Sequence, residues 1–380
     1  MREGPVGAHK SIAIAAGGTA GHINPALALA EELTGRGYQV RFYGEERRLE
    51  GKLVPEHGFD FFPLTVRGFD RSRPWTLVAA LVHVLREKRR LVSAFRQNPE
   101  LCPNLAIGFG AYVELPLMQA AAKLAIPIAL HEQNSVPGLA NRLMARRASL
   151  IAISQPEVRS CFVRAHATPD VIRHTGNPVR SSVLAGTCAH GRAALGIPDS
   201  ATVLLVFGGS LGARHINERL VALKDQLLSI ENLYVVHSTG AADFDATRSA
   251  LALTDTEATR WHLCSYIDDM GNTLAAADMV LSRSGASSIA EIAALHTPAV
   301  LVPYPYATAD HQTSNARYLV DAGAALMFAD TELDSKRFSD ELISLLHDEA
   351  RRAQMRASAA SLGQEKAAST LADELEKLLD

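Results

Sequence analysis

The 380-residue chain has no excess of positive charge, because 38 Lys and Arg residues stand against 41 Asp and Glu residues and give a formal net charge of -3. Proteins that attract nucleic acid through their overall field are basic, so nucleic acid is not an expected partner. The four cysteines, Cys102, Cys161, Cys188 and Cys264, include no Cys-x-x-Cys pair. Their spacing argues against a zinc site or a disulfide framework and favours a reducing compartment.

Long apolar runs are also lacking. No stretch reaches the roughly 18 apolar residues of a membrane-spanning helix, and residues 1–11 lead into a strand rather than into the apolar core of a signal peptide. No carboxylate pair has a clear metal-ligand spacing, so no metal is expected. Because 47% of the residues are hydrophobic, the chain is typical of a globular cytosolic protein. Its length predicts two domains.

The stretch from residue 11 to residue 33 organises the first half of the chain. Residues 12–16 are wholly apolar, which predicts a parallel strand covered on both faces. Gly17, Gly18 and Gly21 follow, and apolar residues then recur at helical spacing. A strand, a glycine turn and a helix form half of a nucleotide-binding unit. The dinucleotide pattern G-x-G-x-x-G is incomplete, since Ala16 replaces its first glycine.

The same arrangement occurs again 191 residues later, from Gly17 to Gly208. An apolar run at residues 202–207 precedes Gly208, Gly209 and Gly212, and a helical pattern follows. We therefore predict an α/β fold with two Rossmann-like, doubly wound domains that face each other across a cleft.

A third strand-to-helix turn, at residues 282–291, has the most informative chemistry. A helix that begins near Ala286 offers unpaired N–H groups and about half a positive charge at its tip. Arg283 adds a planar cation suited to phosphate oxygens, and Glu291 can accept hydrogen bonds from two vicinal hydroxyls, as on ribose. Taken singly, each side chain is equally compatible with an ordinary surface role. Together they predict a site for a nucleoside diphosphate that needs no metal.

Further candidates lie in the first half. His22 lies in the first glycine turn, and a histidine can take a proton from an alcohol at neutral pH; from residue type alone, a capping or core role is equally open. His131, Glu132 and Asn134 follow a predicted strand at residues 127–130, where open α/β sheets bind ligands. They are candidates for binding sugar hydroxyls, or polar scaffolding of the loop.

Residues 71–96 predict a helix with seven Arg or Lys residues and the single acid Glu87. Trp75, Leu77 and Val78 place apolar surface beside this charge. Such a helix suits an anionic bilayer surface. The alternative is an ordinary helix whose apolar face belongs to the core.

Seven motifs in order resemble the MurG family of glycosyltransferases, glycosyltransferase family 28, and the resemblance runs from about residue 12 to about residue 376. They are GGTAGHINPALALA from Gly17, HEQN from His131, TGNPVR from Thr175, GGSLGA from Gly208, YIDDM from Tyr266, SRSGASSIAEI from Ser282 and DHQTSNA from Asp310. The resemblance implies the GT-B fold of two Rossmann-like domains. It implies residues 1–182 as an acceptor and membrane-docking domain, 183–200 as a linker, 201–350 as the UDP-sugar donor domain, and 351–380 as a C-terminal helix returning to the first domain.

The resemblance implies an inverting enzyme that moves N-acetylglucosamine from UDP-N-acetylglucosamine to the 4-hydroxyl of N-acetylmuramoyl-(pentapeptide)-pyrophosphoryl-undecaprenol (lipid I), which gives lipid II for peptidoglycan. The expected partners are these two substrates, an anionic membrane surface and other cell-wall synthesis proteins. No cofactor is expected. The protein would be peripheral on the cytoplasmic side of the inner membrane.

The resemblance also assigns roles to single residues. His22 would be the catalytic base, and Leu77 and Trp75 would dock on the membrane with the cations Arg86, Lys88, Arg89 and Arg90. The donor-binding residues would be Thr19, Ala20, Gly21, Asn134, Arg180, Ser210, Ile267, Arg283, Ala286, Ser287, Ser288, Ile289, Ala290, Glu291 and Gln312.

Three positions depart from the family pattern. Leu211 replaces a common Gln in the second glycine turn, and Ala111 and Glu114 replace a Gly and a Ser near the expected acceptor side. Four alternatives remain open: a GT-B enzyme with another acceptor, a UDP-N-acetylglucosamine epimerase, a nicotinamide-dependent oxidoreductase with Glu45 on the ribose, and a non-catalytic binding protein. Release of free sugar without an acceptor would identify the epimerase.

Overall fold

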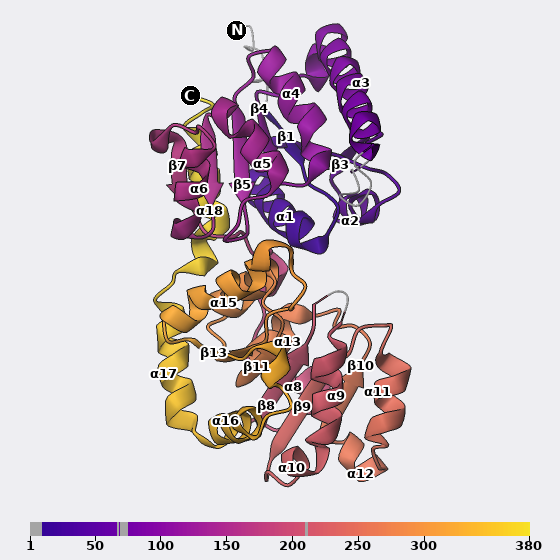
Figure 1. The fold of residues 1–380 in the computed structure, drawn as a ribbon, viewed down its shortest axis with the longest axis vertical. Coiled ribbons are helices and arrows are strands. Elements are labelled where there is room, and N and C mark those ends of the chain that lie inside the picture. Colours follow the sequence, from indigo (N-terminus) through magenta and orange to yellow (C-terminus); the bar gives the residue numbers. More distant parts are fainter. Residues whose placement is uncertain (1–9, 67, 69–74, 210–211) are drawn as a thin grey trace, which may run out of the picture. The chain divides into compact units, whose positions relative to one another are not determined.

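A computed structural model describes residues 10–66, 68, 75–209 and 212–380 (Figure 1). The chain divides into two compact units. Unit 1 comprises residues 1–180 together with 366–380, and unit 2 comprises residues 181–365.

Unit 1 is built on a parallel sheet that has seven strands within the described residues, in the order β3-β2-β1-β4-β5-β6-β7. The strands are β1 (Ser11–Ala15), β2 (Gln39–Gly44), β3 (Asp60–Pro63), β4 (Leu105–Gly108), β5 (Ile128–Glu132), β6 (Leu150–Ile153) and β7 (Ile172–His174). The order reverses direction at β1 and β4, and ligands of doubly wound sheets bind at such a switch point, beyond the carboxyl ends of the strands.

Helices cover both faces of this sheet. They are α1 (Ala20–Gly35), α2 (Leu49–Glu56), α3 (Thr76–Gln97), α4 (Leu115–Lys123), α5 (Leu139–Met144), α6 (Arg159–Arg164) and α18 (Ala367–Glu376). One apolar cluster joins the sheet to α3 and α4, and another joins it to α1 and α18. The last helix therefore completes the core of unit 1 although it comes from the far end of the chain.

Unit 2 repeats the architecture with a parallel sheet of six described strands in the order β10-β9-β8-β11-β12-β13. The strands are β8 (Thr202–Phe207), β9 (Leu233–Ser238), β10 (Trp261–Cys264), β11 (Met279–Ser282), β12 (Ala299–Leu301) and β13 (Ala325–Met327). The helices are α7 (Ser181–Leu184), α8 (Cys188–Leu195), α9 (Arg214–Ala222), α10 (Lys224–Leu228), α11 (Phe244–Leu251), α12 (Asp255–Ala258), α13 (Met270–Ala276), α14 (Ala286–Ala294), α15 (His311–Asp321), α16 (Lys336–His347) and α17 (Glu349–Ala360).

The predicted α/β class with two doubly wound domains is confirmed. The borders of the units differ from the expected ones at two places. Residues 183–200, expected to be a linker, contain α8 and pack within unit 2, and α17 also belongs to unit 2, so only residues 366–380 return to unit 1. Among the described residues, no helix is both long and apolar enough to cross a membrane.

Candidate active site

The first glycine turn, between β1 and α1, is closed by a buried acid that the sequence analysis did not single out. Gly18 has φ +86°, in the left-handed region that favours glycine. A Cβ at Gly17 would lie 2.4 Å from Oε1 of Glu50. Glu50 itself accepts hydrogen bonds from the backbone N–H of Gly18 at 3.1 Å and of Glu45 at 3.2 Å. The carboxyl group of Glu50 on α2 therefore fixes the turn; the backbone of Gly18 favours glycine, and a side chain at position 17 would displace this carboxyl group.

His22 lies in the first turn of α1, and its ring is oriented by Thr19. The Thr19 side chain makes no hydrogen bond to the helix N–H groups, although the residue occupies the N-cap position. Its Oγ1 lies instead 2.9 Å from Nδ1 of His22. When Nδ1–H donates to this oxygen, Nε2 is the unprotonated ring nitrogen and can accept a proton. Thr19 thus both orients the imidazole and leaves the helix tip without a side-chain cap.

The polar residues at the end of β5 are mostly scaffolding. His131 is fully buried; its Nε2–H donates to Gly176 O at 3.0 Å, and its Nδ1 accepts from Gln133 Nε2 at 3.2 Å. Burial lowers the pKa of His131 to about 4, so the ring is neutral. Glu132 is buried as well and accepts from Asn141 Nδ2 and from the backbone N–H groups of Asn134 and Gly138.

In unit 2, α14 follows β11 through the turn predicted to bind a diphosphate. The N-cap residue Gly285 has no side chain to cap the helix, so the first N–H groups of α14 are not capped by it. Arg283 is 7% exposed; its Nη1 donates to the carbonyls of Val302 and Pro303 and pairs with Asp330 Oδ1 at 2.6 Å. The guanidinium is therefore fixed by the protein itself, which limits its direct contact with a ligand.

Gln312 ties this turn to the loop after β12. Its Oε1 accepts from Ser284 N at 3.2 Å and from Tyr304 N at 2.9 Å, which leaves the Nε2 amide as its donor. Glu291 lies on α14 and is 8% exposed. The structure thus brings together three elements of the predicted donor site: the tip of α14, Glu291 one to two turns further along the same helix, and Gln312.

The second glycine turn, which precedes α9, also needs its glycines. A Cβ at Gly208 would lie 2.4 Å from Ala213 N, and one at Gly212, where φ is +78°, would lie 2.4 Å from Thr239 O. His215 on α9 reaches Asp330, with Nδ1 2.8 Å from Oδ2. Asp330 therefore links α9 to Arg283, a connection that the sequence analysis missed.

Each unit of the chain matches one domain of a known family. Residues 12–153 match the glycosyltransferase family 28 N-terminal domain, and residues 203–374 match the C-terminal domain of that family. A relative from Halothermothrix orenii is 37% identical over 95% of this chain and 96% of its own, and is named UDP-N-acetylglucosamine--N-acetylmuramyl-(pentapeptide) pyrophosphoryl-undecaprenol N-acetylglucosamine transferase. The chain belongs to glycosyltransferase family 28.

Further comparisons within the family agree. A relative of the same name from Nitratidesulfovibrio vulgaris is 39% identical over 97% of this chain and 98% of its own length. The crystal structure of Acinetobacter baumannii MurG has a TM-score of 0.73 at 28% identity, over 97% of this chain and 99% of that chain. The family expected from the sequence motifs and its GT-B fold are confirmed.

The residues that the family resemblance picked out lie in both units. Unit 1 holds Thr19, Ala20, Gly21, His22, Asn134 and Arg180, and unit 2 holds Ile267, Arg283, Ala286, Ser287, Ser288, Ile289, Ala290, Glu291 and Gln312. Arg180 has a buried Nε without a hydrogen-bond partner in the described chain. Ile267 lies in the loop between β10 and α13 and is 8% exposed. Ser210, and Leu211 beside it, lie outside the described residues.

The site residues that sequence reasoning missed are two acids that support these turns, Glu50 and Asp330. Each lies far along the chain from the turn that it holds. In the sequence, a buried acid differs from an exposed one only by its apolar neighbours. Many exposed acids also have apolar neighbours, so this pattern does not identify the buried ones.

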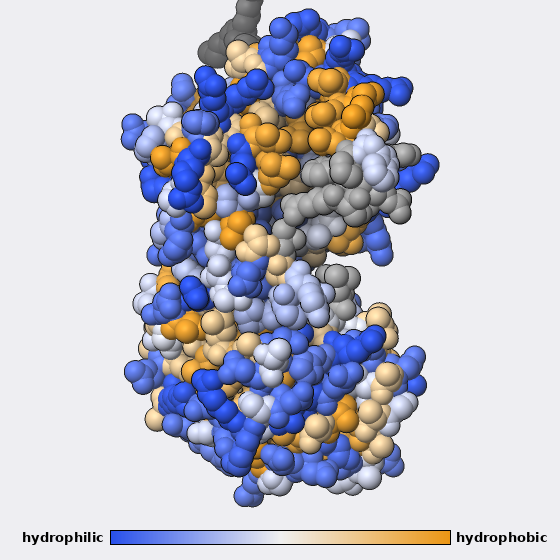
Figure 2. All heavy atoms as spheres, in the orientation of Figure 1, coloured by the Kyte–Doolittle hydropathy of each residue, from blue (hydrophilic) through white to orange (hydrophobic). Residues whose placement is uncertain are grey.

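The basic helix α3 presents an exposed apolar face. The large hydrophobic side chains exposed there are Trp75, Leu77, Val78, Leu81, Val82 and Leu85. Leu139 and Leu143 of α5 are exposed as well, and Figure 2 shows hydrophobic patches over α3 and α5 on the same face of unit 1. The opposite side of α3, with Ala80, Val84, Leu91 and Phe95, is buried in the core. One face of α3 therefore belongs to the core, as the alternative interpretation expects, and the other is the exposed apolar face on which the membrane-docking prediction depends.

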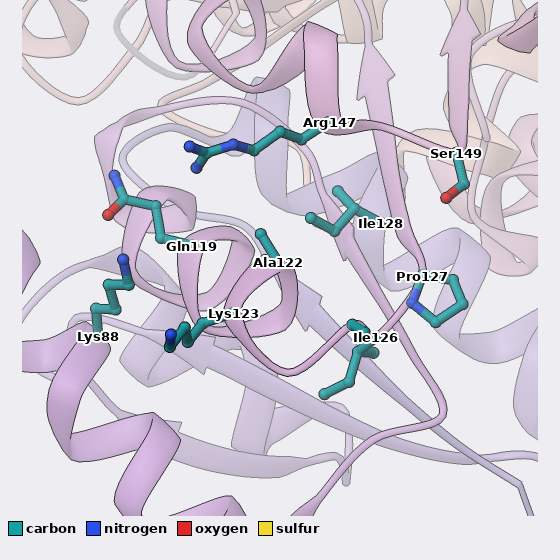
Figure 3. A pocket seen from close by; sticks show the side chains of 10 residues that line it. Lys88, Gln119, Ala122, Lys123, Ile126, Pro127, Ile128, Arg147 and Ser149 are labelled. Carbon is teal, nitrogen blue, oxygen red and sulfur yellow. The ribbon is translucent and has the colours of Figure 1, made fainter.

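Two hollows of about 590 and 510 Å³ border the basic half of α3 and share Lys88 and Lys123. Figure 3 shows Lys88, Gln119, Lys123 and Arg147 around the larger one. Pro127 and Ile128, at the beginning of β5, also line it. The predicted catalytic residues follow the opposite, carboxyl ends of the strands, so these hollows are separate from the glycine-turn site.

Proposed function

We propose that the protein transfers N-acetylglucosamine from UDP-N-acetylglucosamine to the 4-hydroxyl of the N-acetylmuramoyl group of lipid I. The observation that carries the proposal is the membership of both units in glycosyltransferase family 28, together with relatives named for this transfer over nearly the whole chain. Neither of these two relatives is named as an epimerase.

His22 acts as the general base in this proposal. The acceptor hydroxyl oxygen attacks the anomeric carbon of N-acetylglucosamine, its proton passes to Nε2 of His22, and UDP leaves with the electron pair of the broken bond. The 2.9 Å contact between Thr19 Oγ1 and His22 Nδ1 supports this role, because it orients the ring and, when Nδ1–H donates to the hydroxyl oxygen, leaves Nε2 as the acceptor. A single displacement of this kind inverts the anomeric configuration and gives a β-linked product.

Most of the residues that bind the donor in this proposal belong to unit 2. The tip of α14, from Ala286 to Ala290, stabilises the negative charge that develops on the leaving diphosphate. Glu291 accepts from the ribose hydroxyls, Gln312 and Asn134 bind the sugar, and Ile267 meets uracil through its backbone. Arg180, Ser210 and the segment from Thr19 to Gly21 complete the site. Arg283 acts mainly by shaping the turn and by its charge, since Asp330 and two carbonyls hold it.

The exposed face of α3 docks on an anionic membrane surface, which brings the enzyme to its lipid acceptor on the cytoplasmic side of the inner membrane. Apolar side chains from Trp75 to Leu85 and the cations Arg86, Lys88 and Arg89 support this role. Arg90 contributes less, because it pairs with Glu87 at 2.9 Å and lies 4.9 Å over the Phe62 ring.

The deciding experiment is incubation of the purified chain with UDP-N-acetylglucosamine and lipid I. We expect the disaccharide lipid to form, and no free N-acetylglucosamine or N-acetylmannosamine to be released without acceptor. His22→Ala should lower kcat about 100-fold or more while the affinity for the donor, measured by calorimetry, stays the same. Sugar release without lipid I, or near-normal turnover by His22→Ala, would contradict the proposal or the role of His22, respectively.

Membrane docking is tested by co-sedimentation with liposomes of phosphatidylglycerol or of phosphatidylcholine alone. The triple replacement of Arg86, Lys88 and Arg89 by Ala should weaken binding to the anionic liposomes, and added salt should weaken binding of the unaltered chain. A matched control replaces three exposed cations of unit 2, Arg248, Lys336 and Arg337. Equal binding of the two triple variants would show that α3 is not the docking surface.

A further inference from the structure

Glu114 is the most deeply buried acid that the proposed mechanism does not use. It ends the short 3-10 helix Tyr112–Glu114 between β4 and α4, and it is 0% exposed. Its Oε2 accepts from the backbone N–H of Gly110 at 2.6 Å, and a Cβ at Gly108 would lie 2.3 Å from that oxygen. The carboxyl group therefore fills the space that a side chain at position 108 would occupy, and it fixes the backbone N–H of Gly110.

The segment that Glu114 holds has an unfavourable backbone. Gly110 has φ +84° and Ala111 has φ +65°. A residue with a side chain is disfavoured in the left-handed region, so Ala111 needs neighbouring interactions to keep this conformation. The hydrogen bond from Gly110 to Glu114 is such an interaction, one residue before Ala111.

This segment forms one wall of the space beside His22. A Cβ at Gly110 would lie 3.3 Å from Cδ2 and 3.5 Å from Nε2 of the imidazole. The backbone of Gly110 therefore lies close beside the ring, and any side chain at this position would press on the imidazole at the edge that carries Nε2.

The carboxyl group has no opposite charge to balance it. Within the described chain no Lys, Arg or His side chain forms an ion pair with Glu114, and its Oε1 is buried without a hydrogen-bond partner. Burial, with a smaller contribution from the charge of Glu132, raises the pKa of Glu114 to about 8. The group is therefore neutral at pH 7.

Other titratable groups lie on the elements that this 3-10 helix contacts. These elements are β2, α4 and α5, which carry Arg41, Tyr43, Lys123 and Arg142. Glu132 of β5 acts on Glu114 through its charge, and Tyr112 of the same 3-10 helix donates to Glu45. His131 is neutral, and Glu50 and Glu132 already accept backbone hydrogen bonds. None of these groups supplies the missing positive charge.

We propose that Glu114 is a positioning residue for the transfer reaction: its buried carboxyl group holds the Gly110–Ala111 segment beside the imidazole of His22 and so fixes the base. This inference rests on the proposed role of His22 as the base. A glutamine has the same shape, offers the same acceptor to Gly110 and cannot ionise, so Glu114→Gln should preserve the function of a neutral acid. An alanine cannot.

Three variants test the inference: Glu114→Gln, Glu114→Ala and, as a matched control, Glu100→Gln at an exposed glutamate of the same unit. Turnover is measured with UDP-N-acetylglucosamine and lipid I from pH 6 to pH 9.5. We expect Glu114→Gln to keep kcat within about threefold at pH 7, and Glu114→Ala to lose about 100-fold in kcat with little change in KM for the donor, as for a misplaced catalytic group.

The pH profile separates positioning from simple stability. Above pH 8 an uncompensated charge forms in the core of unit 1, and the segment must move to let water reach it. The kcat of the unaltered chain and of Glu100→Gln should therefore fall about fivefold between pH 8 and pH 9, whereas that of Glu114→Gln should stay level. Equal alkaline loss in Glu114→Gln would overturn the proposal.

A second readout does not depend on turnover. The imidazole of His22 is followed by NMR in protein labelled at histidine Cε1, with the resonance assigned by its loss in His22→Asn. Glu114→Ala should shift this resonance or its titration, and Glu114→Gln should not. An unchanged resonance in Glu114→Ala, or a kcat for Glu114→Gln as low as that of folded Glu114→Ala, would refute the positioning role. Normal turnover by His22→Asn would instead refute the role of His22, and the NMR result would still test Glu114.

Discussion

At the scale of single residues, two buried histidines make the protein sensitive to acid. Burial lowers the pKa of His131 in unit 1 and of His237 in unit 2 to about 4, whereas both have a pKa near 6.5 in the unfolded chain. As the pH falls from 6.5 to 4, the unfolded chain binds these protons and the folded chain does not. The free energy of unfolding should therefore fall by about 3 kcal/mol per histidine across this window.

Urea unfolding at pH 7 and pH 4.5 measures this effect. His131→Gln keeps a donor for Gly176 and an acceptor for Gln133 but cannot titrate, so unit 1 of this variant should lose less stability on acidification. His347→Gln, at an exposed position, is the control and should behave as the unaltered chain does. Identical acid losses in the two variants would show that His131 does not titrate as described.

A second residue-scale prediction concerns Glu291 on α14. Glu291→Ala should weaken the binding of UDP-N-acetylglucosamine about 10- to 100-fold, because hydrogen bonds to a charged group contribute roughly 1.5–3 kcal/mol. Glu291 is 8% exposed on the helix that follows the diphosphate turn. Calorimetry with the donor measures the loss, and Glu349→Ala on α17 is the control. Unchanged affinity would remove Glu291 from the ribose site.

Single residues also show where prediction from sequence stops. His22, Glu291 and Gln312 were predicted from motifs, because the residues that define them are adjacent in the chain. The acids that hold the neighbouring turns were not predicted. Glu50 lies 32 residues from Gly18, to which it is hydrogen-bonded, and Asp330 lies far along the chain from its partner Arg283. Such pairs depend on how the sheet order brings strand ends together, and local patterns do not contain that order.

At the scale of elements, the length of a strand decided whether its apolar pattern could be recognised in the sequence. The apolar runs at residues 12–16 and 202–207, predicted as strands, lie within one residue of the bounds of β1 and β8, which bury at least four apolar residues each. The edge strands β7 and β13 were not predicted, because each has three residues and β7 buries only Ile172. A strand of three residues with so few buried side chains gives too short an apolar pattern to be recognised in the sequence.

The link from α9 through Asp330 to the turn before α14 gives an element-scale prediction. The hydrogen bond with Asp330 raises the pKa of His215 above its usual value, so the folded state binds this proton more tightly than the unfolded state. The stabilisation is fully present below pH 6.5 and is lost as the pH rises through the raised pKa of the folded state. His215→Ala should remove that dependence in unit 2.

The measurement is donor affinity from pH 6 to pH 8.5. In the unaltered chain the affinity should weaken as His215 loses its proton and Asp330 is held less firmly against Arg283; in His215→Ala it should be lower and less dependent on pH. Asp330→Asn should weaken binding at every pH, because it leaves Arg283 buried without its carboxylate. A His215→Ala profile that follows the unaltered chain would contradict the link.

At the scale of the whole molecule, the chain leaves unit 1 after Arg180 and re-enters it at Lys366. The returning helix α18 buries Leu371, Ala372 and Leu375 in the cluster formed with β1 and α1. Arg36 of α1 pairs with Asp373 at 2.7 Å and Glu376 at 2.9 Å. These pairs are partly exposed and contribute at most about 1 kcal/mol each, so the apolar contacts of α18 decide how firmly it is held.

Leu371→Ala should therefore destabilise unit 1 by about 2–5 kcal/mol, the usual cost of emptying a buried leucine site. Hydrogen exchange resolved by mass spectrometry distinguishes the units: exchange should speed up in β1, α1 and β4 and stay unchanged in β8 and β11. Leu342→Ala, a buried leucine of α16 in unit 2, is the matched control and should give the reverse pattern. Faster exchange throughout the chain in both variants would mean that the units unfold together, and the stability of α18 would then belong to the whole molecule rather than to unit 1.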